Sequence, residues 1–169
     1  MLTCDDPRVA ELARDALTAA PEDAAKRAEL LRRFVHRHIR TKDLSVGFAS
    51  AAEVARTREG DCTEHGVLLA ALLRADGIPS RVVSGLIYAD QFAGSDDIFG
   101  YHMWTQAYLE IDGEPRWVDL DATLPDSLPM TATHIALAVT GLPDENRINA
   151  LVELAPLMGR LAIKVENVE

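Results

Sequence analysis

Residues 60–85, GDCTEHGVLLAALLRADGIPSRVVSG, contain a complete helix with its start and stop signals, followed by the beginning of a strand. Asp61 and Glu64 have the spacing of a capping box, which predicts that a helix begins at Cys62. The apolar residues that follow lie on several sides of this helix, so we expect it to be central and buried. Gly77 is typical of a helix end, so the helix is predicted to stop at about residue 75.

Helical spacing dominates the chain before this segment, and strand-forming residues dominate after it. Predicted helices cover residues 7–18, 21–39 (with Pro21 in the first position), 51–58 (after a capping box of Ser50 and Glu53) and 143–158. Predicted strands cover residues 81–88, 101–111, 116–122, 133–139 and 161–165, with a loop over 89–100. Helices followed by a mainly antiparallel sheet define an α+β fold, which we expect to form a single domain over residues 1–169.

The composition excludes several classes of partner. The chain has a net charge of −10, whereas nucleic-acid binding requires clustered Lys and Arg, and an anionic lipid surface would repel an acidic protein. The basic residues within 26–37 are predicted to form a solvated helix face. Cys4 and Cys62 define no disulfide framework, and without a secretory signal or a membrane-spanning apolar run we expect a cytoplasmic location.

Cys62 is the first candidate for chemistry because it lies in the first turn of the predicted buried helix. Unpaired backbone N–H groups and the helix dipole favour a negative sulfur there, and the same N–H groups could hold an oxyanion. Asp61 and Glu64 add negative charge and oppose this effect, and they can equally serve only as helix caps. The helix start alone therefore does not determine the reactivity of the thiol, and a base has to be found. Cys4, in an acidic stretch, is interpreted as incidental.

Of the five histidines, His102 has the most informative context. It starts a predicted strand directly after a glycine-containing loop, which is a usual position for a functional side chain. We expect His36 and His38 to lie on the surface of an early helix, and His134 to be structural. His65 could approach the thiol from the cysteine's own helix, but a base in that position usually points along the helix rather than across a cleft.

A hairpin is expected to bring an acid to His102. A two-residue turn at 112–113 pairs Trp104 with Asp121 across two strands and makes His102 the diagonal neighbour of Asp121. Diagonal neighbours lie roughly 7–8 Å apart, within reach of their side chains. Asp119 lies on the same face but two residues further from His102. Side-chain parity therefore permits both acids, and their level along the strand favours Asp121, with Asp119 as an ordinary strand-end acid.

Cys62, His102 and Asp121 thus form a predicted nucleophile, base and orienting acid. The imidazole would take the thiol proton, while the carboxylate would fix the imidazole tautomer and stabilise its positive charge. Each of these residues alone would be weak evidence, because a lone cysteine in a helix is more often part of the core. The prediction depends on the three residues acting as a set.

The sequence also resembles the transglutaminase-like superfamily, which has a papain-like fold. The resemblance covers residues 51–124, through GDC at 60–62, LRADGIPSRVVSG at 73–85, HMW at 102–104 and DAT at 121–123. It implies Cys62 as nucleophile, His102 as base and Asp121 as the third member, with the cysteine on a central helix packed against an antiparallel sheet. Met103 replaces a small residue of the family pattern and Ala122 replaces its proline, which bears on substrate preference more than on activity.

The predicted function is acyl transfer from an amide of a peptide or protein, through a thioester on Cys62. If water accepts the acyl group the enzyme is a peptidase or amidase, and if an amine accepts it the enzyme is a transglutaminase. We favour hydrolysis because nothing in the sequence encodes a dedicated amine site. Trp104 is a candidate for shaping the acyl channel, or for packing under the sheet. No cofactor is expected, and Asp96 and Asp97 are too few and too close for a calcium site.

Two other functions remain open at this point. A binding domain could retain the fold and the three side chains without catalysis. A metal site could use Cys62, His65 and His102, but it would need a further ligand or water, so this spacing is a weak zinc signal and no metal is expected. A basic or neutral peptide would approach the acidic surface more easily than an acidic one. The oligomeric state is not predicted.

Overall fold

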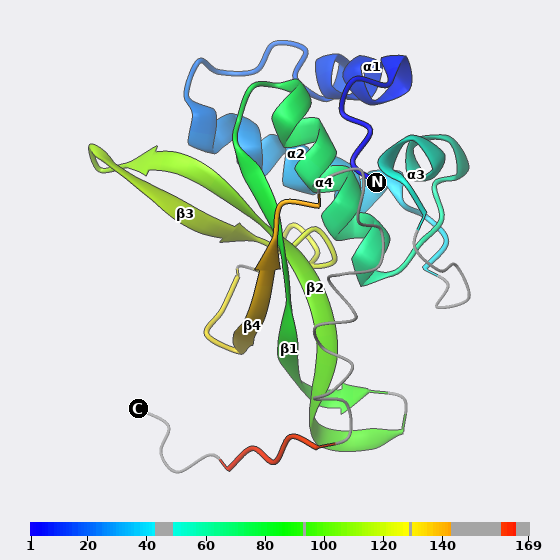
Figure 1. Cartoon of the computed structure of the whole chain (residues 1–169), viewed down its shortest axis with the longest axis vertical. Helices are drawn as coiled ribbons and strands as arrows, with labels where there is room; N and C mark the ends of the chain where they lie inside the picture. Colours follow the sequence, from blue (N-terminus) through cyan, green and yellow to red (C-terminus); the bar gives the residue numbers. More distant parts are fainter. Residues whose placement is uncertain (43–48, 93, 129, 143–159, 165–169) are drawn as a thin grey trace.

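The computed structural model describes residues 1–42, 49–92, 94–128, 130–142 and 160–164. Within these residues the chain forms four helices followed by four strands (Figure 1). The helices are α1 (Pro7–Ala16), α2 (Ala24–His38), α3 (Ala51–Thr57) and α4 (Cys62–Ala75). The strands are β1 (Ser80–Phe92), β2 (Ser95–Ile111), β3 (Glu114–Leu120) and β4 (His134–Thr140). The predicted α+β fold is confirmed, whereas the helix predicted over 143–158 lies outside the described residues.

The start of α4 is the capping box that the sequence predicts. The Asp61 carboxylate accepts a hydrogen bond from Thr63 N at 2.8 Å, and Glu64 Oε2 accepts one from Asp61 N at 3.0 Å. Every residue from Glu64 to Leu73 is buried, as expected for a helix that is apolar on several sides. Apolar burial and local capping therefore hold the first turn of α4 against the core, with Cys62 half-buried at its start.

Capping side chains also decide where the other helices begin. Ser50 and Glu53 form the expected capping box at the start of α3. The prediction that α2 begins at Pro21 is wrong, because the Asp23 side chain caps the helix and accepts a hydrogen bond from Lys26 N at 2.9 Å. A proline at a helix start only removes an unpaired donor, whereas an aspartate cap satisfies one.

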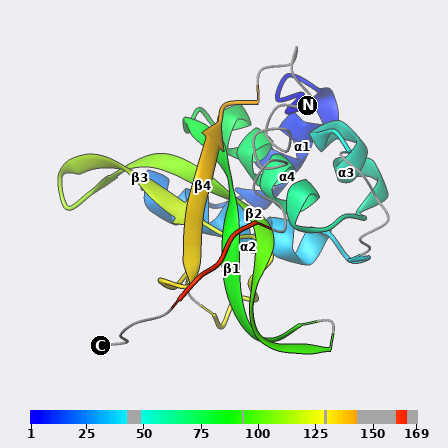
Figure 2. The same ribbon diagram turned by 60° about the horizontal axis from the view of Figure 1, so that its bottom comes forward.

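The four strands form one antiparallel sheet in the order β3–β2–β1–β4. Figure 2 shows β4 running beside β1. Residues 89–92 and 95–100, expected as part of a loop, instead continue the β1–β2 ladder, with Tyr88 opposite Phe99 and Gln91 opposite Asp96. The rings of Tyr88 and Phe99 lie 5.5 Å apart, and Gln91 Nε2 donates to Asp96 Oδ1 at 3.1 Å. These cross-strand pairs stabilise a long hairpin in a stretch that the polar and glycine residues mark as a loop.

The prediction of a strand over 161–165 is wrong for residues 161–164, which form no strand. The alternating side chains of Leu161 and Ile163 instead line a hollow together with Leu86 and Tyr101 of the β1–β2 hairpin. Packing against a hairpin face uses the same apolar alternation as a strand, but it needs no backbone ladder. The alternation alone therefore could not distinguish the two arrangements.

The helices gather at one end of the sheet, while the far end of the β1–β2 hairpin projects beyond them (Figure 1). Within this arrangement α4 is central, since it contacts β1, β2 and all three other helices. The start of α4 consequently faces the middle of β2, where His102 lies. In the part of the chain described by the structure, no helix combines the length and apolarity needed to cross a bilayer.

Candidate active site

Cys62 is held at the first position of α4 by the buried carboxylate of Glu64. Glu64 Oε1 accepts a hydrogen bond from Ala49 N and Glu64 Oε2 accepts one from Asp61 N, both at 3.0 Å. Glu64 therefore connects two backbone segments to the start of the helix. Burial, followed by the hydrogen bond with Asp61, raises the pKa of Glu64. Gly60 has a φ of +151°, and a Cβ there would lie 2.2 Å from the Cβ of Glu64. The local sequence thus fixes the position of the thiol through a glycine, a cap and a buried acid.

The β2–β3 hairpin has the two-residue turn and the register that the sequence predicts. Residues 112 and 113 have φ values of 57° and 81°, as both central residues of a type I′ turn require. In this register Gln106 pairs with Asp119. Asp121 therefore comes two residues later, just beyond the paired part of β3 and at the level of Trp104.

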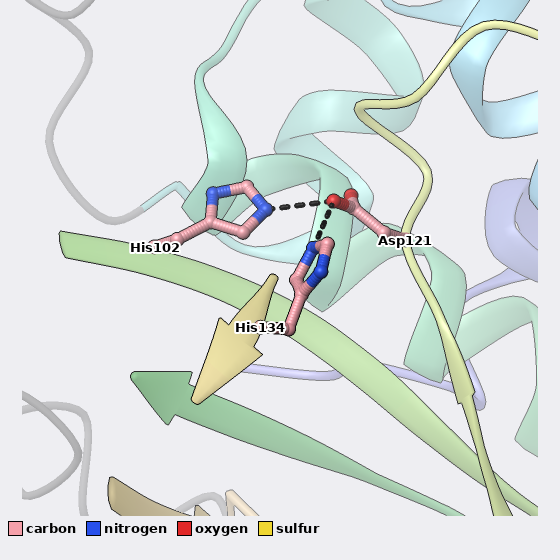
Figure 3. A group of neighbouring side chains, drawn as sticks. All are labelled: His102, Asp121 and His134. Carbon is pink, nitrogen blue, oxygen red and sulfur yellow. Dashed lines mark hydrogen bonds and ion pairs between the residues drawn. The ribbon is translucent and has the colours of Figure 1, made fainter. Parts of the chain in front are cut away.

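His102 and Asp121 meet as the diagonal-neighbour argument predicts (Figure 3). His102 Nε2 donates to Asp121 Oδ2 at 2.8 Å. The other carboxylate oxygen, Oδ1, accepts from the Thr123 backbone N at 2.8 Å and from Thr123 Oγ1 at 2.7 Å. The Asp121 side chain is only 1% exposed, so these donors replace the water that the buried carboxylate has lost. With Nε2 engaged by Asp121, the ring nitrogen left for the thiol is Nδ1.

The electrostatics of the site favour an imidazolium at His102. Burial by itself would lower the pKa of His102, but hydrogen bonds with Asp121 and Cys62, together with the charges of both groups, raise it to about 9. Burial would raise the pKa of Asp121, but the hydrogen bonds from His102 and His134 hold it well below its usual range. Because Cys62 is among the groups that act on His102, the thiol and the imidazole are neighbours across the junction of α4 and the sheet.

His134 is a site residue that the sequence reasoning treats as structural. It begins β4, and its Nε2 lies 3.2 Å from the same Asp121 Oδ2 that His102 contacts (Figure 3). Its Nδ1 lies 3.3 Å from the carbonyl oxygen of Thr131. The pairing of Ile87 with His134 places β4 beside β1, and this long-range pairing has no local signal in the sequence.

Arg32 is a second residue that the sequence reasoning missed. The interpretation of the basic stretch as a solvated face is wrong for this side chain, which is 6% exposed. Its Nη1 donates to the carbonyl oxygen of Leu124 at 2.8 Å and lies 3.4 Å from that of Asp121, so it ties the chain after β3 to α2. A cavity of about 420 Å³ adjoins this contact; neither Cys62 nor His102 lines it, so it lies behind the acid rather than at the thiol.

Trp104 forms one wall beside the two histidines. Its ring stacks with His102 at 6.1 Å between centroids and meets His134 edge-on at 5.2 Å. Its Nε1 donates to Asp119 Oδ1 at 2.7 Å, an oxygen that also accepts from Gln106 Nε2 at 2.7 Å. Asp119 therefore orients the indole of Trp104, while Asp121 orients the imidazole of His102. Trp104 is 2% exposed, so its role toward a substrate stays a prediction and its visible role is packing.

The remaining histidines are buried or half-buried and bonded to the backbone. His65 Nδ1 lies 2.6 Å from Asp61 O, and burial lowers the pKa of His65 to about 4, so the ring is neutral at neutral pH. The expected surface position is wrong for His38, which is 8% exposed and bonded to a carbonyl of α3, because α2 packs that face against α3. His36 is half-buried, with Nδ1 3.1 Å from Ala122 O.

The structure does not gather Cys62, His65 and His102 into a metal site. In the described ranges, the side chains whose possible ligand atoms all lie within 4.8 Å of one another are His102, Asp121 and His134. The ring of His65 bonds back to the carbonyl of the α4 cap instead of turning toward the other two groups. This result contradicts the alternative metal interpretation of the Cys62-x-x-His65 spacing.

We expect the His102–Asp121 pair to make the free energy of unfolding depend on pH. The raised pKa of His102 stabilises the folded state below about pH 6.5, and this contribution is lost as the pH rises through about 9. The lowered pKa of Asp121 contributes stability above about pH 3.9 that is lost on acidification. Urea unfolding at about pH 6 and about pH 9.5 should show a larger alkaline loss for the parent than for His102→Gln, on the order of 3 kcal/mol. Equal losses in the two proteins would contradict the pairing.

A buried helix that starts at a cysteine and packs on an antiparallel sheet with a His–Asp pair defines an α+β protein of papain-like fold. The chain belongs to the Transglutaminase-like superfamily, whose Transglut_core family model matches residues 11–122. The matched range includes Cys62, His102 and Asp121.

Curated relatives match a shorter part of the chain. This chain is 35% identical over 75 residues to the uncharacterized protein Rv2569c of Mycobacterium tuberculosis. It has the same identity to the uncharacterized protein Mb2599c of Mycobacterium bovis. The match covers 42% of this chain and 24% of each relative, so the chain spans about a quarter of the length of these proteins.

Solved structures show the same fold. A candidate cysteine protease from Cytophaga hutchinsonii superposes with a TM-score of 0.63 at 23% identity, covering 82% of this chain and 44% of that one. The periplasmic domain of TgpA from Pseudomonas aeruginosa, bound to ethylmercury, gives 0.51 at 27% identity, over 69% of this chain and 44% of that one. A TGase structure gives 0.52 at 15% identity, over 76% and 34% of the two chains.

Proposed function

We propose that the chain is a cysteine enzyme that acts on an amide bond of a peptide or protein through a thioester on Cys62. The observation that carries this proposal is the 2.8 Å hydrogen bond from His102 Nε2 to Asp121 Oδ2, on an imidazole whose pKa is raised by Asp121 and Cys62. A thiol, a base and an orienting acid in this order make up a nucleophilic site. Membership in the Transglutaminase-like superfamily supports the same chemistry.

In the first half-reaction, His102 Nδ1 takes the thiol proton and the Cys62 sulfur attacks the amide carbonyl carbon. The carbonyl electrons move to the oxygen, which gives a tetrahedral intermediate. The imidazolium then protonates the amide nitrogen, the C–N bond breaks, and the amine leaves with the acyl group bound to sulfur as a thioester. Asp121 stabilises the imidazolium between these steps because it accepts the Nε2 hydrogen bond and stays ionised.

The start of α4 narrows the choice of oxyanion donors. The Asp61 carboxylate already accepts from the backbone N–H groups of Thr63 and Glu64 as a helix cap. The N–H of Cys62, at the first helical position, is the donor that this helix end leaves for a developing oxyanion. Of the backbone N–H groups in the first turn, those of Thr63 and Glu64 are therefore not free to bind the oxyanion, because the Asp61 carboxylate already accepts from them.

In the second half-reaction, an acceptor loses a proton to His102 and attacks the thioester carbonyl. The C–S bond then breaks, and the imidazolium returns its proton to the Cys62 sulfur. Water as acceptor makes the enzyme a peptidase or amidase, and a primary amine makes it a transglutaminase. We favour water because no dedicated amine site can be recognised in the sequence. The chain spans less than half of the solved relatives and about a quarter of the curated ones, so their activities are proposals for this chain as well.

Trapping of the acyl-enzyme tests this proposal. The parent would carry Cys4→Ser, which leaves Cys62 as the one thiol, and would be incubated with a panel of peptides and cell-wall fragments. Intact-mass measurement and peptide mapping should find an acyl adduct on Cys62 that hydroxylamine removes, and no adduct in the matched Cys62→Ala variant. Adding a fluorescent primary amine then decides the acceptor, since a labelled product indicates transfer and an unlabelled acid indicates hydrolysis.

The same experiment can reject the proposal in favour of a non-catalytic binding domain. That conclusion follows if the panel leaves no adduct and iodoacetamide labels Cys62 with the same pH dependence in the parent and in His102→Ala. Equal labelling curves would show that the imidazole does not activate the thiol.

The binding partner of the chain is also a proposal. We propose a peptide or protein amide as partner, and no nucleic acid or membrane surface, because the net charge of −10 repels polyanions. The cytoplasmic location and the single domain over residues 1–169 stay predictions.

A further inference from the structure

We propose that His102, Asp121 and His134 form a binding site for one Zn²⁺ ion, and that the bound ion reversibly blocks the Cys62 chemistry. The three side chains converge on one point: His102 Nε2 lies 2.8 Å and His134 Nε2 3.2 Å from the same Asp121 Oδ2 (Figure 3). All three possible ligand atoms lie within 4.8 Å of one another. An ion that replaced the two N–H protons could therefore contact all three after small side-chain adjustments.

The ligand set suits zinc. Two imidazole nitrogens and one carboxylate oxygen are common Zn²⁺ ligands at about 2.0–2.2 Å, and three protein ligands with a water complete a tetrahedral site. The ligands come from three different segments, since His102 lies on β2, Asp121 follows β3 and His134 begins β4. Their side chains are 8%, 1% and 3% exposed, so a bound ion would be shielded from bulk water.

The atoms behind these ligands are also arranged as in a metal site. Metal-bound histidines usually direct their second ring nitrogen to a backbone carbonyl, and His134 Nδ1 lies 3.3 Å from Thr131 O. Bound carboxylates are usually held through their other oxygen, and Asp121 Oδ1 accepts from Thr123 N at 2.8 Å and from Thr123 Oγ1 at 2.7 Å. This support remains when Oδ2 binds an ion, because it uses different atoms.

A bound ion would inactivate the base. With Zn²⁺ on Nε2, the neutral imidazole of His102 carries its one proton on Nδ1, the nitrogen that faces Cys62. That nitrogen then has no lone pair to accept the thiol proton. Each zinc-bound imidazole keeps one proton, on Nδ1, so the His102 imidazolium releases its Nε2 proton to solvent. Both hydrogen bonds to Asp121 are broken. This consequence rests on the proposed function, whereas the ion site itself does not.

Binding is tested without catalysis in the Cys4→Ser, Cys62→Ala protein, which removes both thiols as competing ligands. Calorimetric titration should show one Zn²⁺ per chain, and Co²⁺ should give the visible absorption of a four-coordinate site. His134→Gln keeps an N–H donor for Asp121 but removes a zinc ligand. Its zinc affinity should fall at least about 10-fold, because removing a residue that only supports a ligand already lowers metal affinity by that factor. His36→Gln is the matched control and should bind zinc like the parent.

Labelling of the Cys4→Ser protein then tests the inhibition. Zn²⁺ should slow alkylation of Cys62 by iodoacetamide, and a chelator should restore the original rate. In His134→Gln, the same Zn²⁺ concentration should leave the alkylation rate unchanged. If near-UV circular dichroism shows that His134→Gln is unfolded, His102→Gln replaces it in the binding arm. Absence of one-to-one binding, or undiminished binding by the folded variant, overturns the site. Binding that leaves labelling unchanged overturns the inhibition, and a His134-dependent complex supports the site even if no acyl-enzyme forms.

Discussion

Replacing Asp121 by asparagine is expected to reduce turnover roughly 10³–10⁴-fold while the fold is retained. Asparagine keeps the shape of the side chain, but it removes the charge that holds His102 as an imidazolium. The pKa of His102, raised to about 9 in the parent, should fall by about 1–3 units, because burial then acts with less opposition. Nuclear magnetic resonance titration of the His102 ring protons measures this shift directly, even before a substrate is known.

Asp119→Asn is the matched control for this experiment. Asp119 lies on the same strand face, but it accepts from Trp104 and Gln106 rather than from His102. The control should therefore keep the raised pKa of His102, while Asp121→Asn should not. If the two variants shift the His102 titration equally, the assignment of Asp121 as the orienting acid is wrong.

Gly85→Ala should lower the free energy of unfolding by about 3 kcal/mol. A Cβ at this position would lie 2.1 Å from the carbonyl oxygen of Ile135 and 2.8 Å from Cη2 of Trp104. Neither neighbour can move cheaply, because Ile135 is paired in β4 and Trp104 is buried beside His102. The register of β1 and β4 also shifts between Ser84 and Gly85, as at a β-bulge where a small residue is needed.

Gly66→Ala is the control for the glycine experiment. A Cβ at position 66 would meet Met103 and Trp104 at 3.6 Å, which is ordinary contact. Alanine is also the better helix former, so this variant should gain up to about 1 kcal/mol. Urea denaturation of both variants measures the difference, and a Gly85→Ala protein as stable as the parent would show that β4 can move away from β1. Because His134 begins β4, Gly85→Ala should also weaken the contact between His134 and Asp121.

Parts of the candidate site could be predicted because they depend on neighbours in the sequence. The Asp61 and Glu64 capping box fixes where α4 begins, and the two-residue turn at 112–113 fixes the register of the β2–β3 hairpin. Side-chain parity permits both Asp119 and Asp121, and the register favours Asp121 as the partner of His102. Each step uses only residues a few positions apart or joined by one tight turn.

Other parts could not be predicted because they depend on contacts between distant segments. His134 reaches Asp121 only because β4 pairs with β1, and Arg32 reaches the backbone of Asp121 only because α2 packs under the chain after β3. The sequence shows these residues as an ordinary histidine and a basic helix face. No local rule distinguishes an arginine that stays in water from one that is buried against a carbonyl.

The sequence by itself determined the fold class, the helix that begins at Cys62 and the hairpin that joins His102 to Asp121, because capping, turn geometry and strand alternation are local. Tertiary structure alone decided that a second histidine shares Asp121, that Trp104 lies buried against both histidines and that His38 and Arg32 are inside. Those features follow from the strand order β3–β2–β1–β4 and from helix packing. Burial energies summed over the whole core select that packing, and no short stretch of residues contains it.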